Sequence, residues 1–394
     1  MTGLPELAFP LADAPALDPD ARFPALREAG PVRVRLPFGE AAWLVSSYEH
    51  VRLVLGDRRF SREQSLEGDE PRVVPMPQRA NLILNHDEPA HSRLRGSVAA
   101  AFTRPGVRRI EAAVEGFVAD LLDRLCAEGS PADLVSGLAA PLPALVMAEL
   151  LGIPAGDHEE FVELTGSLLA SALARQPAEQ TKEAGLRLWE RLGDLVRVQR
   201  RSPGVGLVAE LVRGGASDEE TVALCATVVI AGHDATTMQI GNFCYQLLTA
   251  PGQYARLVAD PGLIENAVEE LMRYSPLGIS TAFPRRVTED VELGDVLLRA
   301  GDYVVVALTA ANRDGAVFDR PEELELTRRP NPHLGFGYGV HRCLGAQLAL
   351  LQLRIVLRAL VSRFPRLALA VPAARVRWSP GLLARSAETL PVRW

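Results

Sequence analysis

Ten residues near the end of the chain, Phe336-Gly337-Tyr338-Gly339-Val340-His341-Arg342-Cys343-Leu344-Gly345, most constrain what it can fold into. Glycines alternate before a single cysteine, and an apolar helical run follows at once. Glycine accepts a positive φ and lets the backbone approach a bound body closely. A cysteine at a helix N-terminus lies where unpaired N–H groups and the helix dipole favour the thiolate. A lone cysteine is otherwise a small buried hydrophobe, but this glycine frame predicts a thiolate that ligates the metal of one large, flat cofactor.

The stretch resembles the haem-binding loop of the cytochrome P450 family, Phe-Gly-x-Gly-x-His-x-Cys-x-Gly, with every named position present. The resemblance implies a mainly α fold with a small β region, in which haem b is buried between a long central helix and the cysteine loop. It implies that Cys343 is the axial iron ligand, whose electron donation favours O–O cleavage. It further implies cofactor contacts from Phe336, His341 and Gly345.

Composition fits a helical globule with a large core, since 48% of the 394 residues are hydrophobic and 6% are aromatic. The net charge of −7 argues against a nucleic-acid partner. The four cysteines lie far apart, which predicts neither a zinc site nor a disulfide framework. We expect no secretory signal and no apolar run that approaches the roughly twenty residues of a membrane helix, hence a cytoplasmic protein. With no room for a flavin or iron–sulfur domain, electrons are expected from a separate ferredoxin and ferredoxin reductase.

The chain is expected to form one domain over residues 1–394, with β-rich parts near 30–50, 283–310 and 379–394. Val32–Leu36 and Trp43–Ser46 predict a β-hairpin. Val291–Leu298 and Tyr303–Leu308 alternate and predict a second pair of strands. In the resembled family, the irregular residues 61–84 cap the substrate pocket and residues 276–283 line it.

His91 and Arg95 are four residues apart on a predicted helix, so they project from one face. Taken alone, such a pair fits an exposed polar face. The resemblance implies instead that both bind a haem propionate, a role that suits bidentate guanidinium contacts. Arg285 matches the family's second propionate arginine, although the adjacent Arg286 leaves this register open by one residue.

A long apolar helix is predicted from Ser217 to about Thr249, with Ser217 at the N-cap and Glu220 three residues later. A helix this long and apolar must run through the core. Gly232, at its centre, costs about 1 kcal/mol of helix propensity against alanine. Its presence suggests that something needs the space, such as a small molecule beside the helix.

The central residues 231–237, Ala-Gly-His-Asp-Ala-Thr-Thr, are similar to the family's oxygen-binding signature Ala-Gly-x-(Asp/Glu)-Thr-(Thr). In the family, the acid and the first threonine relay protons to the site of oxygen activation. Asp234 takes the acid position, but Ala235 stands where the threonine is usual. We expect either that an ordered water or a substrate hydroxyl completes the relay, or that a local π-bulge presents Thr236. Asp234 could also be a buried acid held by a structural partner.

Glu270 and Arg273 match the family's Glu-x-x-Arg and predict a buried ion pair beneath the haem loop. A Glu/Arg pair at this spacing is common on solvated helices, but its place about seventy residues before Cys343 favours the family role.

We therefore expect a monooxygenase that oxidises a small organic substrate with O₂ and two electrons, by hydroxylation or epoxidation, in secondary-metabolite biosynthesis. Two alternatives stay open. One is a peroxide-driven or radical-coupling oxidase, for which the missing threonine matters less. The other is a non-catalytic partner protein, which would not need Cys343 and its glycine frame.

Overall fold

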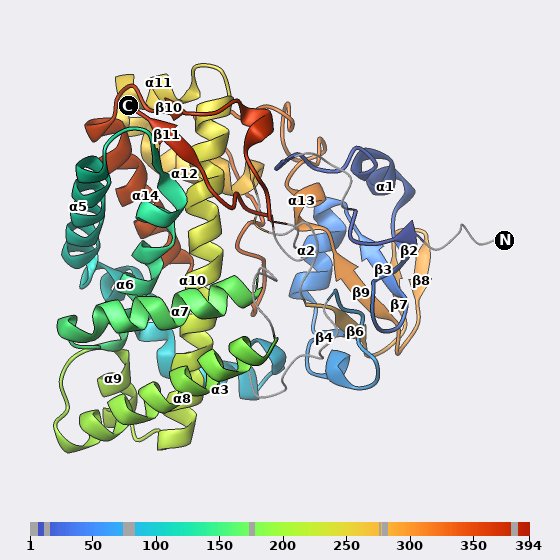
Figure 1. The fold of residues 1–394 in the computed structure, drawn as a ribbon. Helices are drawn as coiled ribbons and strands as arrows, with labels where there is room; N and C mark the ends of the chain where they lie inside the picture. Colours follow the sequence, from blue (N-terminus) through green and yellow to red (C-terminus); the bar gives the residue numbers. More distant parts are fainter. Residues whose placement is uncertain are drawn as a thin grey trace. The chain divides into compact units, whose positions relative to one another are not determined.

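The structure is a computed structural model that describes residues 7–11, 16–73, 83–172, 178–275, 277, 283–379 and 385–394. The chain divides into two compact units (Figure 1). The first, here the sheet unit, comprises Met1–Ser92, Glu269–Cys343 and Gly381–Arg385. The second, here the helical unit, comprises Arg93–Val268, Leu344–Pro380 and Ser386–Trp394. The expectation of a single domain stays a prediction.

The sheet unit is built on six strands in the order β1-β2-β3-β9-β6-β4. The β1/β2 and β3/β9 pairs are parallel, and the remaining pairs are antiparallel. The strands are β1 (Leu7–Ala8), β2 (Val32–Arg35), β3 (Ala42–Val45), β4 (Phe60–Ser61), β6 (Arg285–Val287) and β9 (Tyr303–Val306). The short helices of the unit are α1 (Phe23–Ala29), α2 (Tyr48–Gly56), η1 (Gln64–Leu66), η2 (Ile83–Asn85) and α13 (Leu308–Ala311).

The predicted hairpin at the N-terminal side is confirmed, because β2 and β3 pair antiparallel with Val32 opposite Leu44. The second predicted pair is wrong. β7 (Val291–Leu293) folds back on β8 (Val296–Leu298) through Gly294, whose φ of 61° permits the tight turn. β9 lies between β3 and β6 instead, since all four of its residues are buried and a central position covers both of its faces.

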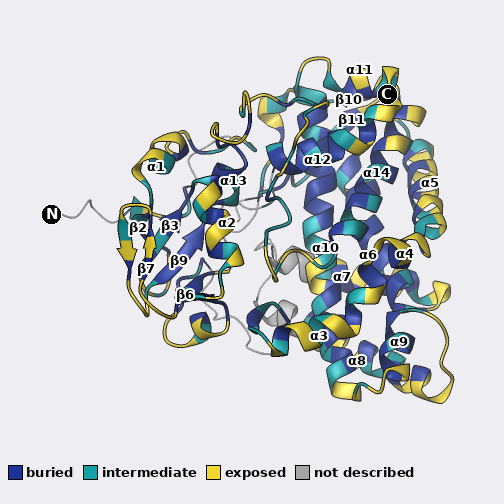
Figure 2. Cartoon of the chain, turned by 180° about the vertical axis from the view of Figure 1, so that it is seen from behind, coloured by how far each residue is buried: buried dark blue, intermediate teal, exposed yellow. Residues whose placement is uncertain are grey.

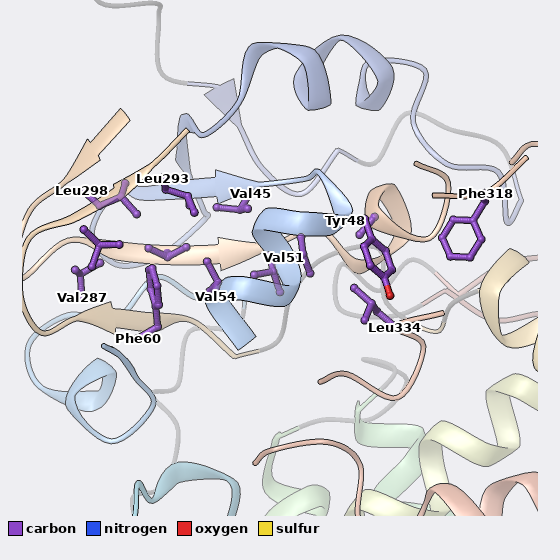
Figure 3. Packing of buried hydrophobic residues seen from close by; sticks show 14 residues of the cluster. Val45, Tyr48, Val51, Val54, Phe60, Val287, Leu293, Leu298, Phe318 and Leu334 are labelled. Atoms are coloured by element: carbon purple, nitrogen blue, oxygen red, sulfur yellow. The ribbon is translucent and has the colours of Figure 1, made fainter. Parts of the chain in front are cut away.

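α2 packs its apolar face on the sheet, and Figure 3 shows Val51 and Val54 pointing toward the strands. The cluster continues to Tyr48, whose ring meets Phe318 edge-on at 5.8 Å between centroids. Leu334 lies at this end of the same cluster. The core of the sheet unit therefore reaches the start of the cysteine loop.

The helical unit surrounds one long helix, α10 (Asp218–Thr249). The other elements are η3 (Ala100–Phe102), α4 (Arg104–Arg108), α5 (Glu111–Glu128), η4 (Val135–Ala139), α6 (Pro141–Leu151), η5 (Ala155–Asp157), α7 (His158–Ala172), α8 (Ala178–Arg201), α9 (Leu207–Arg213), α11 (Gln253–Ala259), η6 (Pro261–Leu263), α14 (Ala346–Arg363) and η7 (Ala373–Arg375). A small sheet joins β10 (Ala368–Leu369), β11 (Pro391–Arg393) and β5 (Ala132–Asp133). Two helices cross the division between the units, α3 (Ala90–Ala99) and α12 (Ile264–Tyr274).

α10 begins as predicted, with the Ser217 hydroxyl accepting the Glu220 N–H at 3.1 Å. It contacts α6, α7, α8, α9 and α14, and buried residues line most of its length (Figure 2). The expectation that no apolar run approaches membrane-helix length is wrong, because α10 meets that length and composition, alone among the helices of the described residues. Its most apolar window is 61% buried within the protein, as in the core helix of a soluble protein.

Candidate haem site

The cysteine loop is shaped by two glycines with left-handed backbone. Gly337 and Gly339 have φ of 70° and 71°. A Cβ on Gly339 would lie 2.4 Å from the Leu55 carbonyl oxygen, so only glycine fits against α2. The loop closes where the Cys343 N–H donates to the Phe336 carbonyl oxygen at 2.8 Å. Cys343 itself is exposed and forms no disulfide.

Helix α14 begins at Ala346, three residues after Cys343 rather than immediately. Leu344 and Gly345 form a turn, and Gly345 is the N-cap residue. The influence of a helix dipole falls off within its first turn. The predicted start of this helix, directly after Cys343, was therefore slightly too early.

The predicted Glu270–Arg273 ion pair is confirmed. Both side chains are completely buried, with nitrogen–oxygen distances of 2.8 and 2.9 Å. Arg273 also donates to the Asn312 carbonyl oxygen at 2.9 Å, and the Asn312 side chain accepts the Leu334 N–H at 2.7 Å. These hydrogen bonds connect the ion pair to Leu334, just before the cysteine loop.

Three predicted cofactor residues come together in the sheet unit. The rings of His91 and His341 lie 4.3 Å apart between centroids, and Arg285 is 7% exposed. Burial, together with the nearby Arg285 and His91 and against the opposing effect of Asp87, lowers the pKa of His341 to about 3. Burial also lowers the pKa of Arg285 to about 10. The buried Arg285 guanidinium can donate charge-assisted hydrogen bonds to an anion, beside the negative charge that Asp87 already places near it.

Arg62 adds a further cation to this cluster that the sequence analysis did not single out. It is 1% exposed, and burial lowers its pKa to about 10. Its guanidinium donates to the Pro284 carbonyl oxygen at 2.9 Å, beside Arg285 in the chain. No local motif marks Arg62, because its contact beside Arg285 is with Pro284, which lies 222 residues later in the chain.

Arg95 follows His91 by about one turn of α3 and is half-buried, within the helical unit. The predicted pocket-lining segments fall largely outside the described residues. Of residues 276–283, only Leu277 and Phe283 are described, and residues 74–82 of the predicted capping loop are not.

The centre of α10 is less buried than the rest of this helix. Ile230 is 53% exposed, and Asp234 and Ala235 are half-buried. An apolar residue so exposed on a core helix marks a face that the helical unit leaves open. Gly232 lies beside it, but a Cβ there would lie 2.9 Å from the Met147 sulfur of α6. The space that Gly232 creates is therefore taken by a side chain, which the sequence did not predict.

Three polar residues of this stretch, His233, Asp234 and Thr236, have partners within the helix. His233 is 2% exposed, and its Nδ1 lies 3.0 Å from the Asp234 carboxylate. The Thr236 hydroxyl donates to the Gly232 carbonyl oxygen at 3.0 Å. α10 is α-helical throughout, so the proposed π-bulge is absent and Thr236 stays buried.

The arrangement in the sheet unit fits haem. Nδ1 of His341 is buried and has no hydrogen-bond partner among the described residues. A carboxylate would satisfy this nitrogen and balance the neighbouring cations. An exposed thiol on an uncrowded loop suits a single axial bond to an iron that the porphyrin already holds.

Comparisons with known proteins agree with this fit. The family model described as Cytochrome P450 matches residues 207–369. Over the full length of both chains, the protein is 42% identical to mycinamicin IV hydroxylase/epoxidase of Micromonospora griseorubida and 44% identical to nocardicin C N-oxygenase of Nocardia uniformis subsp. tsuyamanensis. A solved structure of a point mutant of the mixed-function P450 MycG with mycinamicin IV has 42% identity and a TM-score of 0.95, covering 99% of this chain and 100% of that one.

The fold and these matches define a haem oxidoreductase. The chain belongs to the cytochrome P450 family, so it is a monooxygenase with haem b as its cofactor. The resemblance and the mainly α fold expected from the sequence are both confirmed. Enzymes of this family act on small-molecule substrates with the help of redox partners.

Proposed function

We propose that this P450 hydroxylates or epoxidises a small secondary metabolite in the cytoplasm, with electrons from a separate ferredoxin and ferredoxin reductase. The support for the substrate class is the full-length similarity to two enzymes named for oxidising mycinamicin IV and nocardicin C. The observation that carries the site is the buried His341 Nδ1, which has no hydrogen-bond partner in the part of the chain that the structure describes and lies near the buried Arg285, two residues before the exposed Cys343.

In this proposal Cys343 ligates the haem iron, and Phe336 and Gly345 flank it on the loop. His91, Arg95, Arg285 and His341 hold the propionates, because a propionate carboxylate can accept hydrogen bonds from the buried Arg285 guanidinium and from the His341 ring. Gly232 and Ala235 are further proposed cofactor contacts, Gly232 through its backbone, because Met147 fills the space beside its Cα. Haem b, when bound, supplies the activation of O₂ and the insertion of one oxygen atom into the substrate.

Asp234 and Thr236 are the proposed proton-handling residues. The Asp234 carboxylate is half-buried in the less buried centre of α10, and it lies 3.0 Å from Nδ1 of His233. Ala235 has no hydroxyl, and the Thr236 hydroxyl proton is already donated to Gly232. We therefore favour a bound water or a substrate hydroxyl as the group that completes the relay.

A panel of secondary metabolites that includes mycinamicin IV and nocardicin C, the compounds named for two relatives, tests the substrate class. A substrate is expected to shift the haem absorption spectrum and to gain one oxygen atom in a reaction with ferredoxin, reductase and O₂. No shift and no product across the panel would contradict the proposed class.

The missing hydroxyl at Ala235 favours one second candidate, peroxide-driven oxidation. It predicts turnover with hydrogen peroxide at a rate equal to or above that with the reductase. Cys343→Ala tests the ligand in either case and is expected to abolish the thiolate-type spectrum of the reduced CO complex. Cys126→Ala, a half-buried cysteine of the helical unit, is the matched control and is expected to keep it.

A further inference from the structure

His333 and Glu269 form a hydrogen-bonded pair at the start of the cysteine loop that no family motif above includes. His333 Nε2 lies 2.9 Å from a carboxylate oxygen of Glu269 on α12. The His333 side chain is 6% exposed and that of Glu269 is 33% exposed. Glu269 thus belongs to α12, and His333, at the start of the loop, is largely shielded from water.

The second nitrogen of His333 fixes the state of the ring. Nδ1 accepts the Gly335 backbone N–H at 3.1 Å. Because a backbone N–H can only donate, Nδ1 carries no proton, and the ring proton lies on Nε2. His333 is therefore a neutral imidazole that donates to the Glu269 carboxylate and accepts from the loop backbone.

The contacts continue from His333 toward the cysteine. The His333 ring lies 6.0 Å from the Phe336 ring, tilted by 48°. The Phe336 carbonyl oxygen accepts the Cys343 N–H at 2.8 Å. Gly335 is packed too tightly to move aside, since a Cβ there would lie 2.8 Å from the Met272 carbonyl oxygen.

We infer that the Glu269–His333 pair is a positioning device for the Cys343 thiolate. It holds Gly335 and Phe336 in place, and these residues set the direction of the Cys343 backbone. Residues that orient a metal ligand from one step further out commonly change metal affinity about 10- to 100-fold when they are removed. This inference rests on the proposed role of Cys343 as the haem ligand.

The test compares haem-loaded variants. His333→Phe removes both hydrogen bonds and keeps a ring beside Phe336, whereas Glu269→Leu removes the carboxylate from a partly exposed position. Glu269→Gln keeps an oxygen that can accept from Nε2. His158→Phe is the matched control, because His158 is 6% exposed and bonds a backbone carbonyl, of Ile153, at 3.0 Å in the helical unit.

Three quantities are measured: the thiolate fraction of the reduced CO complex, the rate of haem transfer to a haem-free acceptor protein, and the urea midpoint. His333→Phe and Glu269→Leu are expected to lower the thiolate fraction and to speed haem loss by about tenfold or more. The double variant is expected to lower the thiolate fraction and speed haem loss little further than either single variant, because both substitutions break the same chain of contacts. Glu269→Gln stays near wild type, and His158→Phe lowers the urea midpoint alone.

A wild-type thiolate fraction and haem-loss rate in His333→Phe would overturn the inference, as would equal changes in His158→Phe. If His333→Phe does not accumulate, Glu269→Leu decides by the same two readouts. If Cys343 were not the haem ligand, the unmodified protein would itself lack the thiolate-type spectrum. That result differs from every outcome that tests the His333–Glu269 pair.

Discussion

Arg273 and Glu270 form an ion pair that is fully closed to solvent, and Arg273 further donates to three backbone carbonyls, of Asn312, Pro321 and Glu323. A buried pair with every donor used is costly to break, because the remaining charge is left without water. The pair therefore fixes α12 to the segment that leads into the cysteine loop.

Arg273→Lys is expected to lower the free energy of unfolding by at least about 3 kcal/mol, since a lysine cannot supply the planar fork of donors. Urea unfolding with haem release as a second signal measures this. Arg358→Lys is the control, because Arg358 and Glu265 form an exposed pair on α14 and α12, for which a change within about 0.5 kcal/mol is expected. Comparable losses in both variants would contradict the role given to burial.

Gly232→Ala is expected to gain none of the helix propensity that alanine usually brings, about 1 kcal/mol, because its Cβ meets the Met147 sulfur. Gly241→Ala on the same helix is expected to show that gain, since the nearest atom to its Cβ is 3.8 Å away. In a Met147→Ala background, Gly232→Ala should become stabilising, with a coupling of about 0.5 kcal/mol or more. Thermal unfolding of the wild type, the three single variants and the double variant checks this, and equal gains at both glycines would show that Met147 does not fill the space.

Thiol reactivity of the haem-free native protein at pH 8 is expected to single out Cys343. Burial raises the pKa of Cys225 and of Cys244 to about 12, so their reactive thiolates are scarce at that pH. Cys343 is exposed and should react first with a disulfide reagent, with Cys126 slower. Haem binding should abolish the fast phase. A fast phase that persists in Cys343→Ala would contradict this assignment.

Asp234→Asn is expected to slow oxidation by about a hundredfold while leaving substrate affinity nearly unchanged, because a group that handles protons acts on the rate. Thr236→Val should slow it far less, since the hydroxyl it removes is already bonded to Gly232. Single-turnover rates and spectral Kd values separate the two effects. Equal losses of rate and affinity in Asp234→Asn would make Asp234 a structural acid.

The sequence predicted best where local chemistry decides the structure. Ser217 and Glu220 fix the start of α10, and the Val32–Leu44 pairing follows from alternation around a short turn. The Glu270–Arg273 spacing likewise predicted a pair on one helical turn. Each of these features depends on residues within a few positions of one another.

Contacts between distant segments were predicted less well. β9 pairs with β3, more than 250 residues earlier, because only there are both of its faces covered. The partner of Gly232 is Met147 on another helix, and Arg62 donates to the carbonyl oxygen of Pro284, which lies 222 residues later in the chain. Residues this far apart along the chain form no periodic pattern in the sequence. Their contacts are therefore set by how the elements pack.

Glu269 and Glu270 are consecutive residues of α12, yet one binds His333 and the other binds Arg273. Successive residues point about 100° apart around a helix. An insertion or deletion of one residue within this turn would therefore swing both carboxylates away from their partners together. Loops can change length without this loss, but the number of residues in this one turn of α12 cannot change without breaking both pairs.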